Sequence, residues 1–435
     1  MALEQGGVPS VAVHTDVFAR LAKSTARANG MPTTRQAYVP QPVVDRTPAQ
    51  LRGYIEGTDP VNKRPFMQEV IEGLTGPLTD ADVKGLTFDR SSPRLLPADT
   101  EENLQQFFMD SNWTDFLPVV LPTEARVAAM LKGTSHAPDK VVGRLSPTAF
   151  REAWEFTVEK VAVNAVMAGA RPEYFPVILA MMASGLTARS SSTTSFSGLA
   201  VVNGPIRNQI KMNCGIGAMG PFNHANQTIG RAWNLASQNL QGGSTPGDTY
   251  MGTLGNWYSV GAAFAENEER SPWAPLHTRY GFKPTDSAVT VFRGGRYTHS
   301  GFGPREHWEE KMRRVFAAGE ARQSPLIVMD PIVARLYAER GFTKESLIQW
   351  CADNARLPAS EYWNEQWVQT LIRPFAVAGV EPYASYLKAP PDEMLKLYDP
   401  EEINIVVTGG ETQGAWKIYE GARMKDCTVS IDAWR

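Results

Sequence analysis

The densest group of side chains that could do chemistry lies between residues 266 and 277. Glu266, Glu268 and Glu269 follow an apolar stretch, and His277 comes a few positions later. Carboxylates that are confined together raise each other's pKa, which suits one of them to general acid or base catalysis. With His224 or His277 they could instead hold a hard or borderline cation, and a solvated turn would carry the same residues. On an extended strand, Glu266 and Glu268 would face one side and Glu269 the other.

A glycine-rich stretch offers a second kind of chemistry. Residues 215–220 match the pattern GxGxxG, whose glycines let backbone N–H groups approach a phosphate. Three interpretations are open: a dinucleotide fingerprint, a small-anion cradle formed by the N–H groups of Gly217 to Gly220, or a tight structural loop. The first is the weakest, because Pro221 interrupts the turn and no acidic residue lies about 20 positions on. Cys214 beside the loop is a candidate nucleophile, although a lone cysteine is more often buried packing.

Polar residues near this loop complete the predicted site. Asn223 and Asn226 open a helix directly after it, so they could bind substrate or cap the helix. Arg171 and Glu173 follow a predicted helix end and could hold a carboxylate substrate or pair with each other. The expected catalytic residues are Glu266, Glu268, His277 and Cys214; the expected substrate-binding residues are Asn164, Arg171, Glu173, Gly217, Gly220, Asn223 and Asn226; the expected metal ligands are His224 and Glu269.

The elements that must position these residues alternate between strand and helix patterns. This alternation predicts an α/β fold with mixed, largely parallel sheets flanked by helices. One helical pattern runs from Ser146 to Ala168, where Gly169 ends it. A last strand, Ile403 to Thr408, is expected to lead through Gly409-Gly410 into a helix, by a turn that could bind an anion or simply connect.

Composition divides the chain into four segments. Residues 1–58 show a βα pattern, and residues 59–122 form an irregular connector rich in Pro, Gly and Asp. Residues 123–300 are expected to form a central helical and α/β domain that carries the site. Residues 301–435 are expected to form a C-terminal α/β domain.

Composition also excludes several classes of function. The 43 basic and 46 acidic side chains give a net charge of −3, which carries no electrostatic signature of nucleic-acid or membrane binding. No apolar run approaches the roughly 20 residues of a membrane span, and we expect a cytoplasmic protein. Three widely separated cysteines fit a reducing compartment, and none has the spacing of a zinc site. The patterns GxSxG, HExxH and GxxxxGK do not occur, which disfavours the corresponding hydrolase, zincin and P-loop mechanisms.

Several stretches resemble the UGSC-like (seleno)protein family of bacterial proteins. They are residues 117–124, 159–169, 171–174, 202–206, 226–232 and 264–276, within roughly residues 115–285. The opening, Val8 to Val13 with the helix after it, is similar to the segment that follows the family's Sec/Cys-Gly-Ser-Cys motif. That motif resembles the redox motif of glycine and betaine reductase selenoproteins, and it does not occur in this sequence. Either the chain begins after the motif, or a partner subunit supplies it, or this member does other chemistry.

Two functions of different classes follow. The first is an enzyme, or the large subunit of one, that acts on a small polar or anionic metabolite. It would be a metal-assisted lyase or hydrolase with a divalent metal as cofactor, or an oxidoreductase whose partner subunit bears a thiol or selenol. The second is a non-catalytic scaffold subunit of a multi-protein complex, with aromatics such as Trp113 or Trp257 in its interface. In both cases we expect an oligomer and no nucleic-acid partner.

Overall fold

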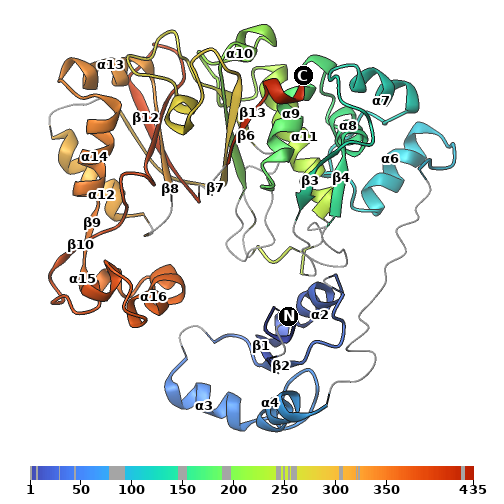
Figure 1. The fold of residues 1–435 in the computed structure, drawn as a ribbon, viewed down its shortest axis with the longest axis vertical. Coiled ribbons are helices and arrows are strands. Elements are labelled where there is room, and N and C mark those ends of the chain that lie inside the picture. Colours follow the sequence, from blue (N-terminus) through green and yellow to red (C-terminus); the bar gives the residue numbers. More distant parts are fainter. Residues whose placement is uncertain are drawn as a thin grey trace.

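The largest element of the fold is a mixed seven-stranded sheet (Figure 1). The computed structural model describes residues 2–435 except 6–7, 29, 44–45, 78–93, 146–153, 189–196, 242–245, 248–249, 253–254, 256–261, 303–306, 320, 322–323 and 423–426. Six strands run in the order β11-β8-β12-β7-β5-β6, and β13 pairs with β7. The strands are β5 (Gly198–Asn203), β6 (Ala262–Ala265), β7 (Ala288–Phe302), β8 (Ser324–Met329), β11 (Asn404–Val407), β12 (Ala415–Ala422) and β13 (Thr428–Ser430).

The fold is α/β, as predicted, but the expectation of largely parallel sheets is wrong. In the main sheet, β11 with β8 and β5 with β6 pair in parallel. The pairs β12 with β8, β12 with β7, β5 with β7 and β13 with β7 are antiparallel. A parallel neighbour requires a crossover connection of a dozen or more residues. Residues 408–414 are too few for such a crossover, so β12 turns back beside β8.

Two of the helix predictions are wrong, because residues assigned to them form strands. Residues 415–422 form β12 rather than a helix, because Trp416 and Ile418 pack in one core while Tyr419 packs in another, an alternation of period two. Residues 154–157 form β4 (Trp154–Thr157), which pairs with β3 (Val141–Leu145). The helix expected from Ser146 therefore begins only at α8 (Val158–Met167), where the Thr157 side chain accepts a hydrogen bond from Lys160 N. Residues 146–153 of that prediction lie outside the described part of the chain.

Helices cover the outer face of the sheet (Figure 1). On the β5, β6 and β7 side these are α8, α9 (Phe175–Ala183) and α11 (His224–Gln241). On the β8, β11 and β12 side they are α12 (Trp308–Ala317), α13 (Pro331–Glu339) and α14 (Lys344–Asn354). Helix α9 is apolar along its whole length, as expected for a helix that is buried on every side.

The opposite face of the sheet encloses a second, inner hydrophobic core. Strands from both ends of the order contribute to it, so the sheet curls and its edge strands β6 and β11 meet. The Thr408 Oγ1 donates a hydrogen bond to the Ala265 carbonyl (2.8 Å), and Asn267 N donates to the Val407 carbonyl (2.7 Å). The residues that follow these two strands are thereby placed side by side. The inner core consists of Leu199, Val201, Phe264, Leu276, Phe292, Leu326, Val328, Val406 and Tyr419.

The N-terminal unit is a small βαβ arrangement, drawn in blue in Figure 1. In it, β1 (Ala12–Thr15) and β2 (Gln36–Val39) pair in parallel, and α2 (Ala19–Ala28) connects them. Helices α3 (Pro48–Glu56) and α4 (Phe66–Thr75) follow, and the Thr47 and Gln50 side chains form a capping box at the start of α3. The βα pattern predicted for this part of the chain is present.

Shorter elements complete the described structure. Strands β9 (Arg356–Pro358) and β10 (Met394–Lys396) pair with each other. Within the described residues, no helix has the length and apolar character needed to cross a membrane. The remaining elements are α1 (Ala2–Gln5), α6 (Glu101–Asp110), α7 (Glu124–Leu131), α10 (Ile206–Gln209), α15 (Ala359–Tyr362), α16 (Arg373–Val377), α17 (Tyr383–Tyr386), a π-helix (Val368–Ile372) and 3-10 helices at Asp16–Phe18, Pro172–Tyr174, Leu276–Tyr280 and Asp432–Trp434.

Candidate functional site

Four strands of the main sheet end at the candidate site. Strand β5 ends at Asn203, β6 is followed by Glu266, β8 by Asp330 and β11 by Thr408. Because β5 and β6 are parallel, and β8 and β11 are parallel, each pair places its carboxyl ends together, and the curl of the sheet joins the two pairs. Ligands of α/β proteins bind outside the carboxyl ends of strands. The fold thus positions several predicted residues where a site is expected.

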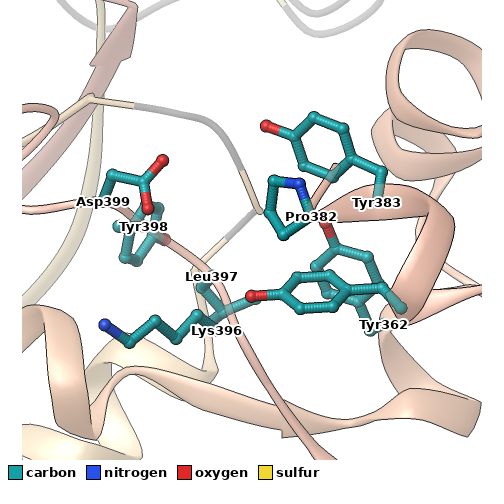
Figure 2. Close-up of a pocket in the computed structure, with 8 residues that line it drawn as sticks. Tyr362, Pro382, Tyr383, Lys396, Leu397, Tyr398 and Asp399 are labelled. Carbon is teal, nitrogen blue, oxygen red and sulfur yellow. The ribbon is translucent and has the colours of Figure 1, made fainter. Parts of the chain in front are cut away.

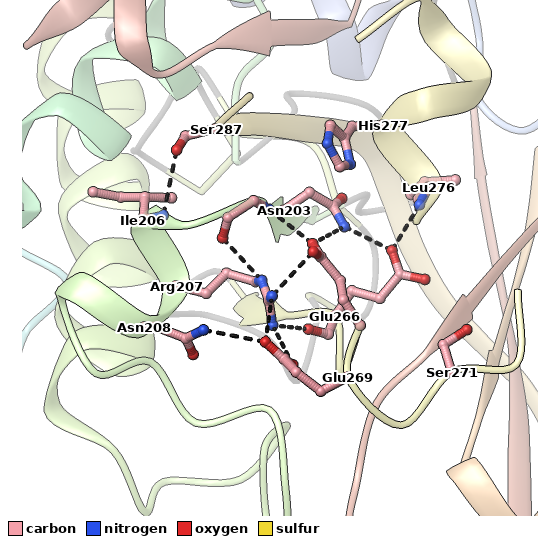
Figure 3. Close-up of polar contacts among 12 residues, drawn as sticks. Asn203, Ile206, Arg207, Asn208, Glu266, Glu269, Ser271, Leu276, His277 and Ser287 are labelled. Atoms are coloured by element: carbon pink, nitrogen blue, oxygen red, sulfur yellow. Dashed lines mark hydrogen bonds and ion pairs between the residues drawn. The ribbon is translucent and has the colours of Figure 1, made fainter. Parts of the chain in front are cut away.

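Five side chains form a hydrogen-bonded group that we call the acidic network: Asn203, Arg207, Glu266, Glu268 and Glu269 (Figure 3). Arg207, at its centre, is 3% exposed. Its Nη2 lies 3.0 Å from an oxygen of Glu268 and 3.0 Å from an oxygen of Glu269, and its Nη1 donates to the Glu266 carbonyl (2.7 Å). Arg207 therefore ties the loop after β5 to the loop after β6. The sequence prediction missed it, although a basic residue four positions after a predicted strand was a usable signal.

Glu266 is completely buried and fully engaged. Its Oε2 accepts hydrogen bonds from Asn203 Nδ2 and Leu276 N, both at 2.7 Å. Its Oε1 lies 3.7 Å from the Nζ of Lys344, which is itself nearly buried. A buried carboxylate needs such partners to offset its lost hydration. The contacts suit Glu266 to holding the strand ends in place.

Glu268 is engaged in the same way. Its Oε1 accepts hydrogen bonds from Gly204 N (2.7 Å) and Asn203 Nδ2 (3.0 Å), and its Oε2 pairs with Arg207. Neither of the two carboxylates predicted to move a proton has an unoccupied oxygen. Both therefore act first as positioning residues for the loops around them.

Glu269, expected as a metal ligand, is bound to Arg207. It also accepts a hydrogen bond from Asn208 Nδ2 (3.1 Å), and its side chain is 56% exposed. The hydrogen bond from Arg207 lowers the pKa of Glu269 from 4.5 to about 2. The carboxylate is thus charged at neutral pH and committed to Arg207.

Cys214 lies between the acidic network and the end of β11. Its carbonyl accepts hydrogen bonds from Gly409 N (2.9 Å) and Thr408 Oγ1 (3.3 Å). Burial raises the pKa of the Cys214 thiol, and the positive charge of Arg207 offsets part of that effect. The thiol is therefore protonated at neutral pH, which favours the packing interpretation over an activated nucleophile.

His277 is completely buried beside the acidic network. Its Nε2–H donates to the Lys283 carbonyl (2.9 Å). Within the described residues, His277 Nδ1 and Asn203 Oδ1 are buried without a hydrogen-bond partner. Figure 3 shows the His277 ring above the Asn203 amide. These two atoms are therefore hydrogen-bond acceptors that the acidic network does not use.

A second polar group lies across the joined edges; we call it the Asp330 site, and it consists of Asp330, Gly409, Glu411, Arg270 and Arg335. Asp330 is 7% exposed, and its Oδ1 accepts a hydrogen bond from Ile332 N (2.8 Å) at the start of α13. Its Oδ2 has no such partner within the described residues and lies 3.7 Å from the position of a Cβ on Gly409. Burial raises the pKa of Asp330, against the opposing effects of the Ile332 N–H and the Arg335 charge.

Charged side chains lie at the surface near the turn at Gly409, and the charge of Arg335 acts on Asp330. Glu411 pairs with both Arg270 and Arg335, which are 58% and 45% exposed. Gly409 adopts a φ of +109°, a conformation that favours glycine. The sequence prediction missed Asp330, although an acidic residue directly after the apolar strand 326–329 marks the carboxyl end of a buried strand.

The glycine-rich stretch is held as a tight loop. Asn226 accepts a hydrogen bond from Asn213 N (3.1 Å) and donates to the carbonyls of Asn213 (2.9 Å) and Ala218 (3.0 Å). Gly217 adopts a φ of +74°, and the N–H groups of Ala218 and Gly220 donate within the loop. Two of the N–H groups that were expected to hold an anion are thus engaged. The structural interpretation of the loop is favoured.

Contacts around the loop support the same view. Asn223 caps α11 by accepting a hydrogen bond from Asn226 N (3.1 Å), as the capping alternative predicted. A Cβ on Gly410 would lie 2.0 Å from the Cγ1 of Ile216, so the loop packs directly on the turn after β11. The loop therefore borders the Asp330 site without supplying a cradle to it.

Four predicted residues lie away from both groups. His224 is at the start of α11, where burial, followed by the charge of Arg171, lowers its pKa. Arg171 and Glu173 pair with each other at 3.9 Å and are exposed, as the structural alternative predicted. Asn164 accepts a hydrogen bond from Asn239 (2.7 Å), which lies about 22 Å along α11 from His224 at 1.5 Å per residue.

The described part of the chain contains no group of three or more His, Cys, Asp or Glu side chains placed to hold a metal ion. Of the two expected ligands, Glu269 belongs to the acidic network and His224 lies outside both groups. The expectation of a divalent metal cofactor therefore rests on residue types alone. Of the two aromatics expected in an interface, Trp113 packs against a core, and Trp257 lies outside the described residues.

A pocket in the C-terminal part is lined largely by aromatic side chains (Figure 2). Its volume of about 10 Å³ holds roughly one water molecule, so a metabolite does not fit. Its lining consists of Tyr362, Pro382, Tyr383, Tyr386, Lys396, Leu397, Tyr398 and Asp399.

Comparison with known proteins gives one likeness. The model of the UGSC family matches residues 1–60. The resemblance predicted from the opening of the chain is confirmed for this segment. The match spans β1, α2, β2 and α3, so it concerns the N-terminal unit, and the acidic network and the Asp330 site lie outside it. No curated protein and no solved structure matches the chain.

Proposed function

We propose that the chain is an enzyme that acts on a small polar or anionic metabolite at the Asp330 site by acid–base chemistry. The observation that carries the proposal is the state of Asp330. It is a nearly buried carboxyl group at the convergence of four strand ends, with one oxygen held by α13 and the other unoccupied within the described residues. Burial that raises the pKa of a carboxyl group favours its neutral form, which suits the group to exchanging a proton with a substrate.

The surroundings of Asp330 fit an anionic substrate. Arg270 and Arg335 are exposed and converge on the single carboxylate of Glu411. Guanidinium groups bind carboxylates and phosphates through paired hydrogen bonds. An anionic group that replaced Glu411 would be held by both guanidiniums, and one of them, that of Arg335, lies close enough for its charge to act on Asp330.

The acidic network has a positioning role in this proposal. Glu266 and Glu268 hold the ends of β5 and β6, and Asn267 carries that order to the turn at Gly409 through a hydrogen bond from Nδ2 to the Gly409 carbonyl (3.2 Å). A reacting group requires such support, because small misplacements of it reduce the rate strongly. The buried Arg207 also holds these strand ends, because it binds Glu268 and the Glu266 carbonyl.

The test compares the wild-type chain with Asp330→Asn. Asparagine also caps helices, so the start of α13 is kept while the titratable group is lost. Small carboxylates and phosphate monoesters are incubated with each protein, and products are followed by mass spectrometry. We expect at least one compound to be converted by the wild type and about 10²-fold more slowly by Asp330→Asn.

The matched control is Asp353→Asn, an exposed carboxylate that pairs with Lys396. It should react like the wild type. The proposal fails if no compound is converted by the wild type, or if Asp330→Asn converts it as fast as Asp353→Asn does.

A second function, as a subunit of an assembly, is favoured by a different observation. The segment from the π-helix to Leu387, the residue after α17, exposes five large apolar side chains: Leu371 (52%), Phe375 (56%), Val377 (71%), Val380 (43%) and Leu387 (39%). Large apolar side chains that are exposed together in one short segment favour a site of protein association. We expect the double variant Phe375→Ser with Val377→Ser to lower the mass of the particle in light scattering. An unchanged mass would count against this second function.

A further inference from the structure

The N-terminal unit contains an open pocket of about 280 Å³ between its sheet and α2. Ala12 and His14 alternate along β1 on the side that faces α2, and Gln36 lies beside them on β2. The side chains on this face are short or polar, so they do not fill the space under the helix. The nine described lining residues are Ala12, His14, Phe18, Leu21, Ala22, Thr25, Ala26, Thr34 and Gln36.

The lining defines the polarity of a ligand. Five of the nine residues are apolar, and none of the nine carries a permanent charge. An ionised ligand would lose hydration there without gaining a charged partner, which is costly. An uncharged ligand with a mainly apolar body would instead gain from burial.

His14 supplies a free hydrogen-bonding group. Within the described residues neither ring nitrogen has a hydrogen-bond partner, although the ring lies 6.0 Å from that of Tyr38. Burial lowers the pKa of His14, so the ring is neutral at pH 7 and carries one donor and one acceptor. A neutral imidazole on an otherwise apolar wall matches a ligand hydroxyl.

Volume limits the size of the ligand. A cavity of about 150 Å³ accommodates benzene, and drug-sized sites begin at about 300 Å³. The pocket therefore has room for a single substituted ring. We propose that the N-terminal unit binds a small uncharged molecule with one aromatic ring and one hydroxyl group in this pocket, with His14 bonded to the hydroxyl.

The experiment uses the full chain and two probes, 4-methylphenol and toluene, which differ in the hydroxyl group. Affinities are measured by ligand-observed NMR titration. We expect saturable binding of 4-methylphenol, about 5-fold tighter than that of toluene, from one net hydrogen bond. In His14→Leu the two probes should bind equally.

Ala22→Phe fills the pocket and should weaken both probes at least 10-fold. The matched control is Val13→Phe on the opposite face of β1, where Val13 is 52% exposed, and its affinities should stay within 2-fold of the wild type. Circular dichroism checks that each variant is folded, and His14→Leu provides a test independent of Ala22→Phe. The proposal is overturned if the wild type shows no saturable binding, if Ala22→Phe binds like Val13→Phe, or if His14→Leu keeps the preference for 4-methylphenol.

Discussion

The Arg207 guanidinium and the Glu268 carboxylate lie 3.0 Å apart, and their side chains are only 3% and 12% exposed. Arg207 belongs to α10, which follows β5, and Glu268 follows β6. The pair therefore joins two loops at neighbouring strand ends. Breaking a buried pair from one side leaves an uncompensated charge, and this asymmetry makes the pair testable.

Replacement of Arg207 by Met should destabilise the protein strongly. It would leave Glu268 without its cation and remove the donor to the Glu266 carbonyl (2.7 Å). The expected loss in the free energy of unfolding is about 3–5 kcal/mol, measured by urea denaturation. Arg171→Met is the control, because Arg171 is 61% exposed and pairs loosely with Glu173, and it should cost about 0–1 kcal/mol. Equal losses for the two variants would contradict a structural role of Arg207.

The pair between Glu269 and Arg207 should make stability depend on pH in the acid range. The folded pKa of Glu269 is lowered to about 2, so its contribution is fully present above the ordinary value of 4.5 and is lost as the pH falls toward 2. The difference in unfolding free energy between the wild type and Glu269→Gln should shrink over this window. Glu310→Gln serves as the control, because Glu310 on α12 is similarly exposed and pairs with Arg314. A difference that stays constant from pH 5 to pH 2.5 would refute the shift.

Two glycine-to-alanine changes should have opposite effects on stability. A Cβ on Gly198, at the start of β5, would lie 2.0 Å from the buried ring of Trp233, so Gly198→Ala should cost about 1–3 kcal/mol or more through overpacking. A Cβ on Gly53, inside α3, meets nothing within 4 Å, so Gly53→Ala should stabilise its helix by about 0.5–1 kcal/mol. Thermal unfolding of both variants checks the direction of each change in stability. If Gly198→Ala left the stability unchanged, the side chains around Trp233 would have to rearrange to accommodate the added methyl group.

Cys214 should be the most reactive of the three thiols in the folded protein, yet slow at neutral pH. Cys351 and Cys427 are buried, whereas Cys214 is partly accessible. Burial raises the pKa of Cys214 above 9.0, so its alkylation by iodoacetamide should keep accelerating above pH 9. Peptide mass spectrometry after timed labelling measures the rate at each site. A rate that levels off near pH 7 would instead indicate an activated thiolate.

Local signals in the sequence mark several of the elements. Thr123 caps α7, Thr47-Pro48 opens α3 and Pro331 begins α13, because caps and first-turn prolines act within a few residues. The buried strand β8 was likewise visible as an apolar run. These features depend on neighbours along the chain, which a sequence displays directly.

The tertiary structure alone decided how the strands pair and which polar residues meet. Residues 415–422 became a strand because β7 and β8 flank them on both sides. Glu266 and Glu268 were visible as an acidic cluster, but their engagement depends on Asn203 and Arg207, some 60 positions earlier in the chain. Asp330 was passed over because an acidic residue after a strand resembles an ordinary helix cap. Its candidacy becomes visible only when the parallel pairing of β8 with β11 places the turn at Gly409 beside it and burial withdraws its carboxyl group from water.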